Sequence, residues 1–136
     1  MLTDTTPAPV AETTPDAAIL SAWERRKAAF ERYNALPIAD DTDPTYDADD
    51  QLTDAERHEW AIINDAEAAM VAATVTTPRA VAALLWTALS NSVTDRAQDD
   101  AAVKGDLAAM LAFDEKLDWD ERLSLAALRS HKAMEI

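Results

Sequence analysis

Aspartates are concentrated in one short segment of this chain. Residues 37 to 52, PIADDTDPTYDADDQL, contain six aspartates and no lysine or arginine. Carboxylates this close together can bind a hard cation such as Ca²⁺, because such ions prefer oxygen ligands. They can also present a dense negative field to a positively charged partner. The six residues are Asp40, Asp41, Asp43, Asp47, Asp49 and Asp50.

The calcium interpretation fails on spacing. A helix–loop–helix calcium site needs a glycine at the sixth position of its loop and a glutamate at the twelfth. Counting from Asp41 places Tyr46 and Leu52 at those positions, and the register that begins at Asp43 fails in the same way. We therefore predict a solvated acidic loop over residues 37–52 without a metal site. Weak binding of a cation in another geometry stays open as an alternative.

Other reactive patterns are missing from the sequence. The chain has no cysteine, which excludes disulfides and thiolate chemistry. Its one glycine, Gly105, cannot build a phosphate-binding loop or a dinucleotide fingerprint. The two histidines, His58 and His131, lack partners at metal-ligand spacing, since the HEWAI segment ends in Ile62 where a zinc motif has histidine. We expect both histidines at the surface, and we predict a protein that is not an enzyme and uses no cofactor.

A single basic cluster falls between residues 25 and 32. Its members stand on the first predicted helix, beside Glu24 and Glu31 and just before the aspartate loop. We expect them to form ion pairs with these acids, because oppositely charged side chains three or four residues apart are neighbours on a helix. The members of the cluster are Arg25, Arg26, Lys27 and Arg32.

Four tryptophans are spread along the chain. Three of them, Trp23, Trp60 and Trp86, fall at apolar positions of predicted helices and are expected in the core. The fourth, Trp119, stands between two aspartates, so we expect it to be exposed. An exposed tryptophan is a candidate interface anchor, because such rings contribute much of the binding energy at protein interfaces.

The elements that must position these residues are helices. Alanine, leucine and charged residues dominate the 136-residue chain, and a single glycine argues against hairpins. The predicted fold class is all-α, a small bundle of four to five helices. Hydrophobic spacing and proline positions predict helices over residues 14–36, 53–74 and 77–94, from residue 94 or 99 to 113, and from residue 118 onward.

Capping patterns mark three of the helix starts. Thr-Pro pairs at residues 14–15 and 77–78 each place threonine at the N-cap and proline at the first helical position. Thr53 with Glu56 forms a capping box. The third predicted helix has no charged residue between residues 80 and 94, so we expect it to be buried at the centre of the bundle.

Length and charge limit the organisation of the chain and its partners. Residues 1–13 are rich in threonine, proline and alanine and predict a disordered tail, followed by a single helical domain over 14–136. The net charge of −14 argues against direct contact with nucleic acid or an anionic membrane. The N-terminus lacks the pattern of a secretory signal and no segment is apolar enough to span a bilayer, so a cytoplasmic location is expected.

One stretch carries a resemblance to known proteins. From Trp60 to Leu89 the chain combines a helix containing Asp-Ala-Glu-Ala-Ala, a threonine-rich break, Thr-Thr-Pro and an apolar helix. In this it resembles small uncharacterised helical proteins of bacterial and prophage origin. The resemblance covers under a quarter of the chain and implies a phage-type accessory protein without a known active site.

Together these observations favour a non-catalytic protein-interaction module. We expect it to act as an acidic inhibitor or nucleic-acid mimic that occupies a basic surface of a partner protein. The alternative is an assembly protein that acts by helix packing as a homodimer, and an enzyme of unknown type ranks third. The predicted partner-binding residues are Asp40, Asp41, Asp43, Asp47, Asp49, Asp50, Asp54, Glu56, Glu59 and Trp119.

Overall fold

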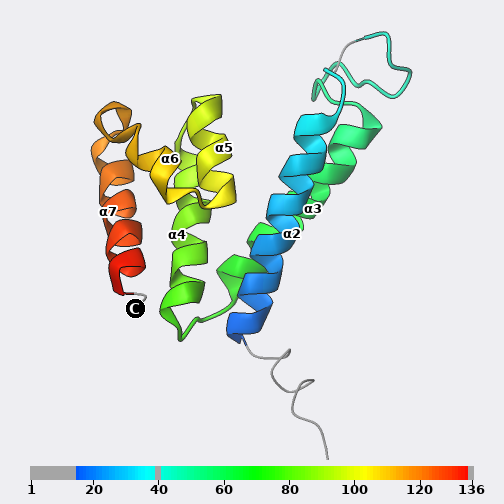
Figure 1. Cartoon of the computed structure of the whole chain (residues 1–136). Coiled ribbons are helices and arrows are strands. Elements are labelled where there is room, and N and C mark those ends of the chain that lie inside the picture. Colours follow the sequence, from blue (N-terminus) through cyan, green and yellow to red (C-terminus); the bar gives the residue numbers. More distant parts are fainter. Residues whose placement is uncertain (1–14, 39–40, 135–136) are drawn as a thin grey trace, which may run out of the picture.

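The computed structural model describes residues 15–38 and 41–134, and this part of the chain is built from helices (Figure 1). No β-strand occurs in these two ranges, which confirms the predicted all-α class. The predicted tail over residues 1–13 lies outside them. The elements are α2 (Pro15–Ala35), α3 (Asp54–Ala72), α4 (Pro78–Ser92), α5 (Arg96–Lys104), α6 (Leu107–Leu111), the 3₁₀ helix η1 (Asp114–Lys116) and α7 (Trp119–Met134).

Side-chain caps begin α3 and α4 as the sequence predicts. The Thr53 hydroxyl accepts a hydrogen bond from the Glu56 amide at 3.3 Å, and the Glu56 carboxylate accepts one from the Thr53 amide at 2.9 Å. These two bonds complete the capping box of α3. The Thr77 hydroxyl caps α4 by accepting from the Ala80 amide at 3.3 Å. The predicted cap at residue 14 lies outside the described residues.

The number of helices differs from the prediction because one expected helix is divided. The described residues form six α-helices, since Gly105 ends α5 with φ 69°, in the left-handed region, and Asp106 then caps α6. A Cβ at position 105 would stand 3.1 Å from the ring of Trp23 and 3.4 Å from Nε1 of Trp86. This turn therefore needs glycine both for its backbone angle and for the close approach of two indoles.

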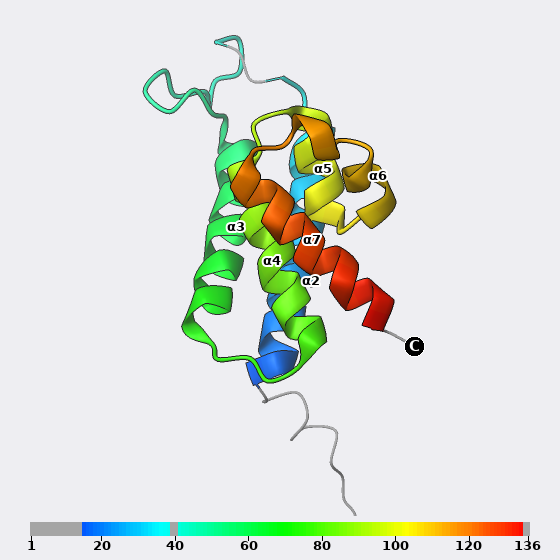
Figure 2. The same ribbon diagram turned by 90° about the vertical axis from the view of Figure 1, so that its left-hand side faces the viewer.

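Two groups of helices pack side by side. α2 and α3 form a long antiparallel pair, while α5 and α7 pack against α4 on the other side of the molecule (Figure 1). α4 and α5 both contact α2 and so join the groups. Figure 2 shows α7 crossing over α4. The loop between α2 and α3 lies at the outer end of their pair, beyond the other helices (Figure 1).

The apolar helix α4 is not buried on all sides, contrary to the prediction. Ala83, Trp86 and Leu89 form part of its inner face and are 1%, 7% and 1% exposed, and the helix contacts α2, α5 and α7. Val81, in contrast, is 42% exposed. A prediction based on the absence of charge between residues 80 and 94 overestimates the burial of this helix, because small and uncharged residues also occupy the outer face of a helix.

A buried arginine holds the two groups together. Arg26 of α2 is 0% exposed. Its Nε donates to Glu67 of α3 at 2.8 Å, and its Nη2 donates to the side chains of Ser90, at 3.0 Å, and Asn91, at 3.2 Å, on α4. Ser90 in turn donates to Asp99 of α5 at 2.7 Å. One polar network therefore links four helices.

The basic residues between positions 25 and 32, which are close together in the sequence, are divided between the core and the surface in the structure. Lys27 pairs with Glu24 at 2.8 Å, as expected of surface charges on one helix. Arg26 instead faces inward, because it stands seven residues, or two helical turns, after the buried Ile19. The prediction that Arg26 belongs to a surface cluster is wrong, since the helical period places it on the apolar face.

We expect Arg26→Ala to lower the free energy of unfolding by about 3 kcal/mol, because it leaves the partly buried carboxylate of Glu67 without its cation. Lys104→Ala is the matched control. It removes an ion pair to Asp100 in which the side chains are 63% and 47% exposed, and should change stability by less than about 0.5 kcal/mol. Urea unfolding followed by circular dichroism measures both. Equal losses in the two variants would show that the buried network does not stabilise the fold.

Candidate functional site

The exposed carboxylates of the α2–α3 loop and of the first residue of α3 lie together at the outer end of the molecule (Figure 1). We call this group the acidic tip. Asp40, which the sequence analysis also includes, lies outside the described residues. The acidic tip consists of Asp41, Asp43, Asp47, Asp49, Asp50 and Asp54.

Hydrogen bonds within the loop fix its backbone. Three aspartates each accept a hydrogen bond, at 2.8 to 3.0 Å, from the amide two residues further on, which is the pattern of an Asx turn. The chain then reverses, and the Asp47 amide donates to the Leu52 carbonyl at 3.0 Å. Gln51 adopts φ 59° within this reversal, a conformation that few residues other than glycine take. The three turns join Asp43 to Thr45, Asp47 to Asp49 and Asp50 to Leu52.

Arg57 of α3 clamps the middle of this loop to its C-terminal end. One of its terminal nitrogens donates to the Leu52 carbonyl at 2.8 Å, and the other donates to the Thr45 carbonyl at 2.7 Å. Arg57 also forms ion pairs with Asp50, at 3.3 Å, and with Asp54. The hydrogen bond with Asp54 is the main cause of a raised Arg57 pKa, so the clamp remains charged.

Four carboxylates of the acidic tip are available to a partner. Asp41 and Asp49 form no hydrogen bond or ion pair through their carboxylates with any described residue. Asp43 and Asp47 each use one oxygen in a turn, which leaves the second oxygen for a ligand or a partner. The other two members of the tip are held by Arg57. The tip thus combines carboxylates that shape the loop with carboxylates that face solvent.

Two of the predicted partner-binding residues are buried. Glu56 and Glu59 are 6% and 8% exposed. Glu56 completes the capping box, and Glu59 accepts a hydrogen bond from Arg32 of α2 at 3.0 Å. Both lie on the face of α3 that also carries the buried Ile63 and Met70, at helical spacing. That spacing is visible in the sequence and separates buried from exposed carboxylates better than the local density of charge.

A second exposed feature lies on α7. Trp119 is 69% exposed, as the sequence predicts, and Leu123, one turn later, is 56% exposed. The guanidinium of Arg122 lies over the Trp119 ring, 5.4 Å from its centroid. Ala127 and Met134 continue the same face of the helix and are also exposed. We call Trp119, Leu123, Ala127 and Met134 the apolar strip.

The remaining groups that the sequence analysis considers do not come together in a site. His58 on α3 is exposed, and His131 on α7 is half-buried. Within the described ranges, no group of three or more His, Asp or Glu side chains is arranged to hold a metal ion. None of the helices in that part of the chain is both long enough and apolar enough to cross a membrane.

The titration of Asp43 tests whether the first turn of the loop forms in solution. The hydroxyl and the amide of Thr45 donate to one Asp43 oxygen at 2.6 and 2.8 Å. The bond from the hydroxyl is the main reason that the pKa of Asp43 is lower than usual. Thr45→Ala should therefore raise this pKa toward that of a free aspartate, whereas Thr94→Ala, at a remote exposed site, should leave it unchanged. NMR titration of the carboxyl carbon measures both.

The sign of the pH effect follows from the lowered pKa. The hydrogen bonds from Thr45 favour the charged form of Asp43 and so stabilise the turn. This stabilisation is complete when the pH is above the Asp43 pKa of the unfolded chain. It is lost as the pH falls through the lower pKa of the folded chain. An Asp43 pKa that does not respond to Thr45→Ala would contradict the turn.

Comparison with known proteins identifies no relative of this chain. No protein-family model, no curated protein and no solved structure matches it. The resemblance of residues 60–89 to small phage-type helical proteins therefore gains no support from these comparisons.

Proposed function

We propose that the acidic tip binds a basic surface of a partner protein and thereby competes with nucleic acid for that surface. The observation that supports this proposal is the placement of exposed carboxylates on an internally braced loop at the outer end of the α2–α3 pair. A loop at the end of a two-helix projection can enter a concave surface that the broader helical body cannot. Grooves that hold nucleic acid are both concave and lined by lysine and arginine.

The uneven distribution of charge supports the same proposal. Residues 37–74 contain eleven acidic residues and one basic residue, a net charge of −10 out of −14 for the chain. Fields of separate charges add only within about one Debye length, roughly 8 Å at physiological salt. Acidity that served solubility alone would have no need to gather in one segment. Acidity that matches a basic surface has to be concentrated in this way.

The bracing of the loop lowers the entropic cost of binding. Fixing the backbone of one residue costs about 1–2 kcal/mol in conformational entropy. Three Asx turns and the Arg57 clamp already hold the backbone of the free protein. A partner therefore meets a loop that is close to its bound shape. Complementary charge then mainly accelerates association, which makes the interaction sensitive to salt.

Replacing four aspartates of the acidic tip by asparagine should abolish partner binding without unfolding the loop. Asparagine keeps the side-chain oxygen that an Asx turn uses but removes the charge. The chosen positions spare both ion pairs of Arg57. The measurement is the recovery of bound proteins from a cell lysate on the immobilised chain, at low and at high salt. The four positions are Asp41, Asp43, Asp47 and Asp49.

A second quadruple variant controls for net charge. It changes exposed acids elsewhere on the surface to their amides, namely Glu24, Glu31, Glu115 and Asp120. We expect the same protein to be retained by this control, lost at high salt and released by added duplex DNA. Retention by the tip variant at high salt would rule out binding through the acidic tip. Release by salt but not by DNA would rule out competition with nucleic acid.

The apolar strip favours a second function, assembly through helix packing. Its two largest members, Trp119 and Leu123, are the kind of exposed side chains that anchor protein interfaces. A two-fold dimer places the same surface of both copies in contact, so like charge at that surface opposes it. α7 avoids this problem, because its two acidic residues are offset by three basic ones. It is thus better suited to self-association than the acidic tip.

If the apolar strip forms a dimer, Trp119→Ser combined with Leu123→Ser should convert it to a monomer, because the change removes the exposed Trp119 ring and the exposed Leu123 side chain. Val71→Ser is the matched control, since Val71 is 86% exposed on a different helix, α3. Sedimentation equilibrium of the three proteins gives the masses. A wild-type chain that sediments as a monomer at all concentrations would exclude assembly.

A further inference from the structure

A cavity of about 340 Å³ lies between α2, α4 and α7, beside the junction of α5 and α6. Trp23 of α2, Trp86 of α4 and Leu128 of α7 line it. Gly105 also lines the cavity and lies against both indoles, and the junction adds Asp106 and Leu107 to the lining. The wall thus combines two aromatic rings and aliphatic side chains with polar groups, and the volume is within the range of about 300–1,000 Å³ typical of small-molecule sites.

One indole in this wall has a hydrogen-bond donor without an acceptor. Nε1 of Trp23 is buried and has no partner among the described residues. The atom is closed to water, so an acceptor on a ligand in the cavity does not reach it.

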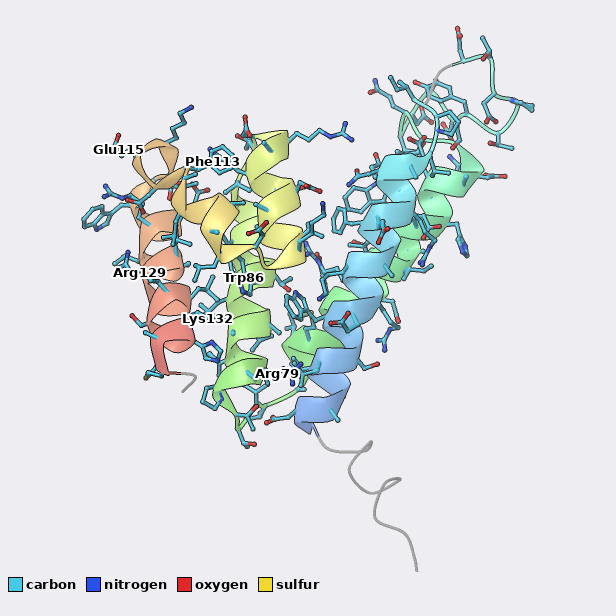
Figure 3. The ribbon with its side chains drawn as sticks, in the orientation of Figure 1. Arg79, Trp86, Phe113, Glu115, Arg129 and Lys132 are labelled. Carbon is cyan, nitrogen blue, oxygen red and sulfur yellow. The ribbon has the colours of Figure 1, made fainter. Side chains whose placement is uncertain are left out.

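The rim of the cavity carries positive charge, although the chain as a whole is acidic. Arg79 at the start of α4 is exposed and forms no ion pair with any described residue. His131 and Lys132 of α7 line the same cavity and each has an interaction of its own, so Arg79 is the cation that is left to balance an anion. Figure 3 shows Arg79 and Lys132 below Trp86, on α4 and α7. The acid in the lining, Asp106, is engaged in capping α6.

Two larger cavities lack this combination. One, of about 460 Å³, lies between α2 and α5, where Lys27 and Lys104 are already paired with acids of their own helices. The other, of about 530 Å³, lies between α2 and α3, where Arg32 is paired with Glu59 and Arg25 forms no ion pair with a described residue. In the described part of the chain, neither is lined by a tryptophan.

We propose that the cavity between Trp23 and Trp86 binds a small flat anion, an aromatic or heteroaromatic ring that bears one carboxylate. The ring packs against the two indoles. Arg79 at the rim balances the carboxylate. A neutral ring gains nothing from this charge, and a cationic ring is repelled by it. The residues involved are separate from the acidic tip, so this inference does not depend on the proposed function.

The test uses the full chain labelled with ¹⁵N, and naphthalene-2-carboxylate as the probe. The indole N–H resonances are assigned with Trp23→Phe and Trp86→Phe. We expect these two resonances to shift during the titration, while those of Trp60 and Trp119 stay in place. The neutral probe naphthalene-2-carboxamide should bind at least about fivefold more weakly, because it lacks the charge that Arg79 attracts.

A pair of double variants separates charge at the rim from net charge. Arg79→Gln with Lys132→Gln should weaken binding of the carboxylate about fivefold and leave the amide unaffected. Arg96→Gln with Lys116→Gln removes two exposed cations outside the cavity and should change neither affinity. The dispersion of the same spectra shows that each variant is folded. Unshifted Trp23 and Trp86 resonances, equal binding of the two probes, or equal losses in the two double variants would each overturn the proposal.

Discussion

Burial of one cation sets the arrangement of the helices. An arginine removed from water needs several acceptors at fixed positions, because only good geometry compensates its desolvation. The acceptors of Arg26 come from α3 and α4, and Ser90 extends the network to Asp99 on α5. A core of alanine and leucine alone tolerates small shifts of one helix along another, whereas directional bonds to a planar fork of nitrogens do not. The buried network thus favours one packing of the α2–α3 pair against α4 and α5.

Local chemistry is predictable from this sequence, whereas long-range polar pairing is not. The capping box of Thr53 and Glu56, and the cap at Thr77, mark helix starts because donor and acceptor lie three residues apart. The partners of Arg26 lie 41 to 65 residues away, and no local window identifies them. Helical spacing does show that Arg26 shares a face with the buried Ile19, but charge alone assigns it to the surface. For Arg26, the helical period and the charge of the side chain predict different locations, and the helical period gives the correct one.

The same distinction applies to the candidate sites. The acidic tip is contiguous in the sequence, so composition alone locates its described members, and the flanking aspartates indicate the exposure of Trp119. The burial of Glu59 depends on Arg32, which is 27 residues away on α2. The cavity is even harder to predict from the sequence, because its two indoles come from helices that are brought together only by the fold. Gly105 is the one local hint, since a lone glycine in a helical pattern often marks a break or a close approach.

The acidic tip and the cavity are far enough apart to act separately. The tip surrounds the start of α3, and Arg79 follows the end of that helix by seven residues. The 19 residues of α3 span about 28 Å, more than three Debye lengths at physiological salt. The field of the tip is therefore largely screened at Arg79, which is why a chain of net charge −14 can offer a cationic rim to an anion. Coupling between the two regions has to be mechanical, and the bonds of Arg26 to Glu67 on α3 and Ser90 on α4 are the rigid connection that would carry it.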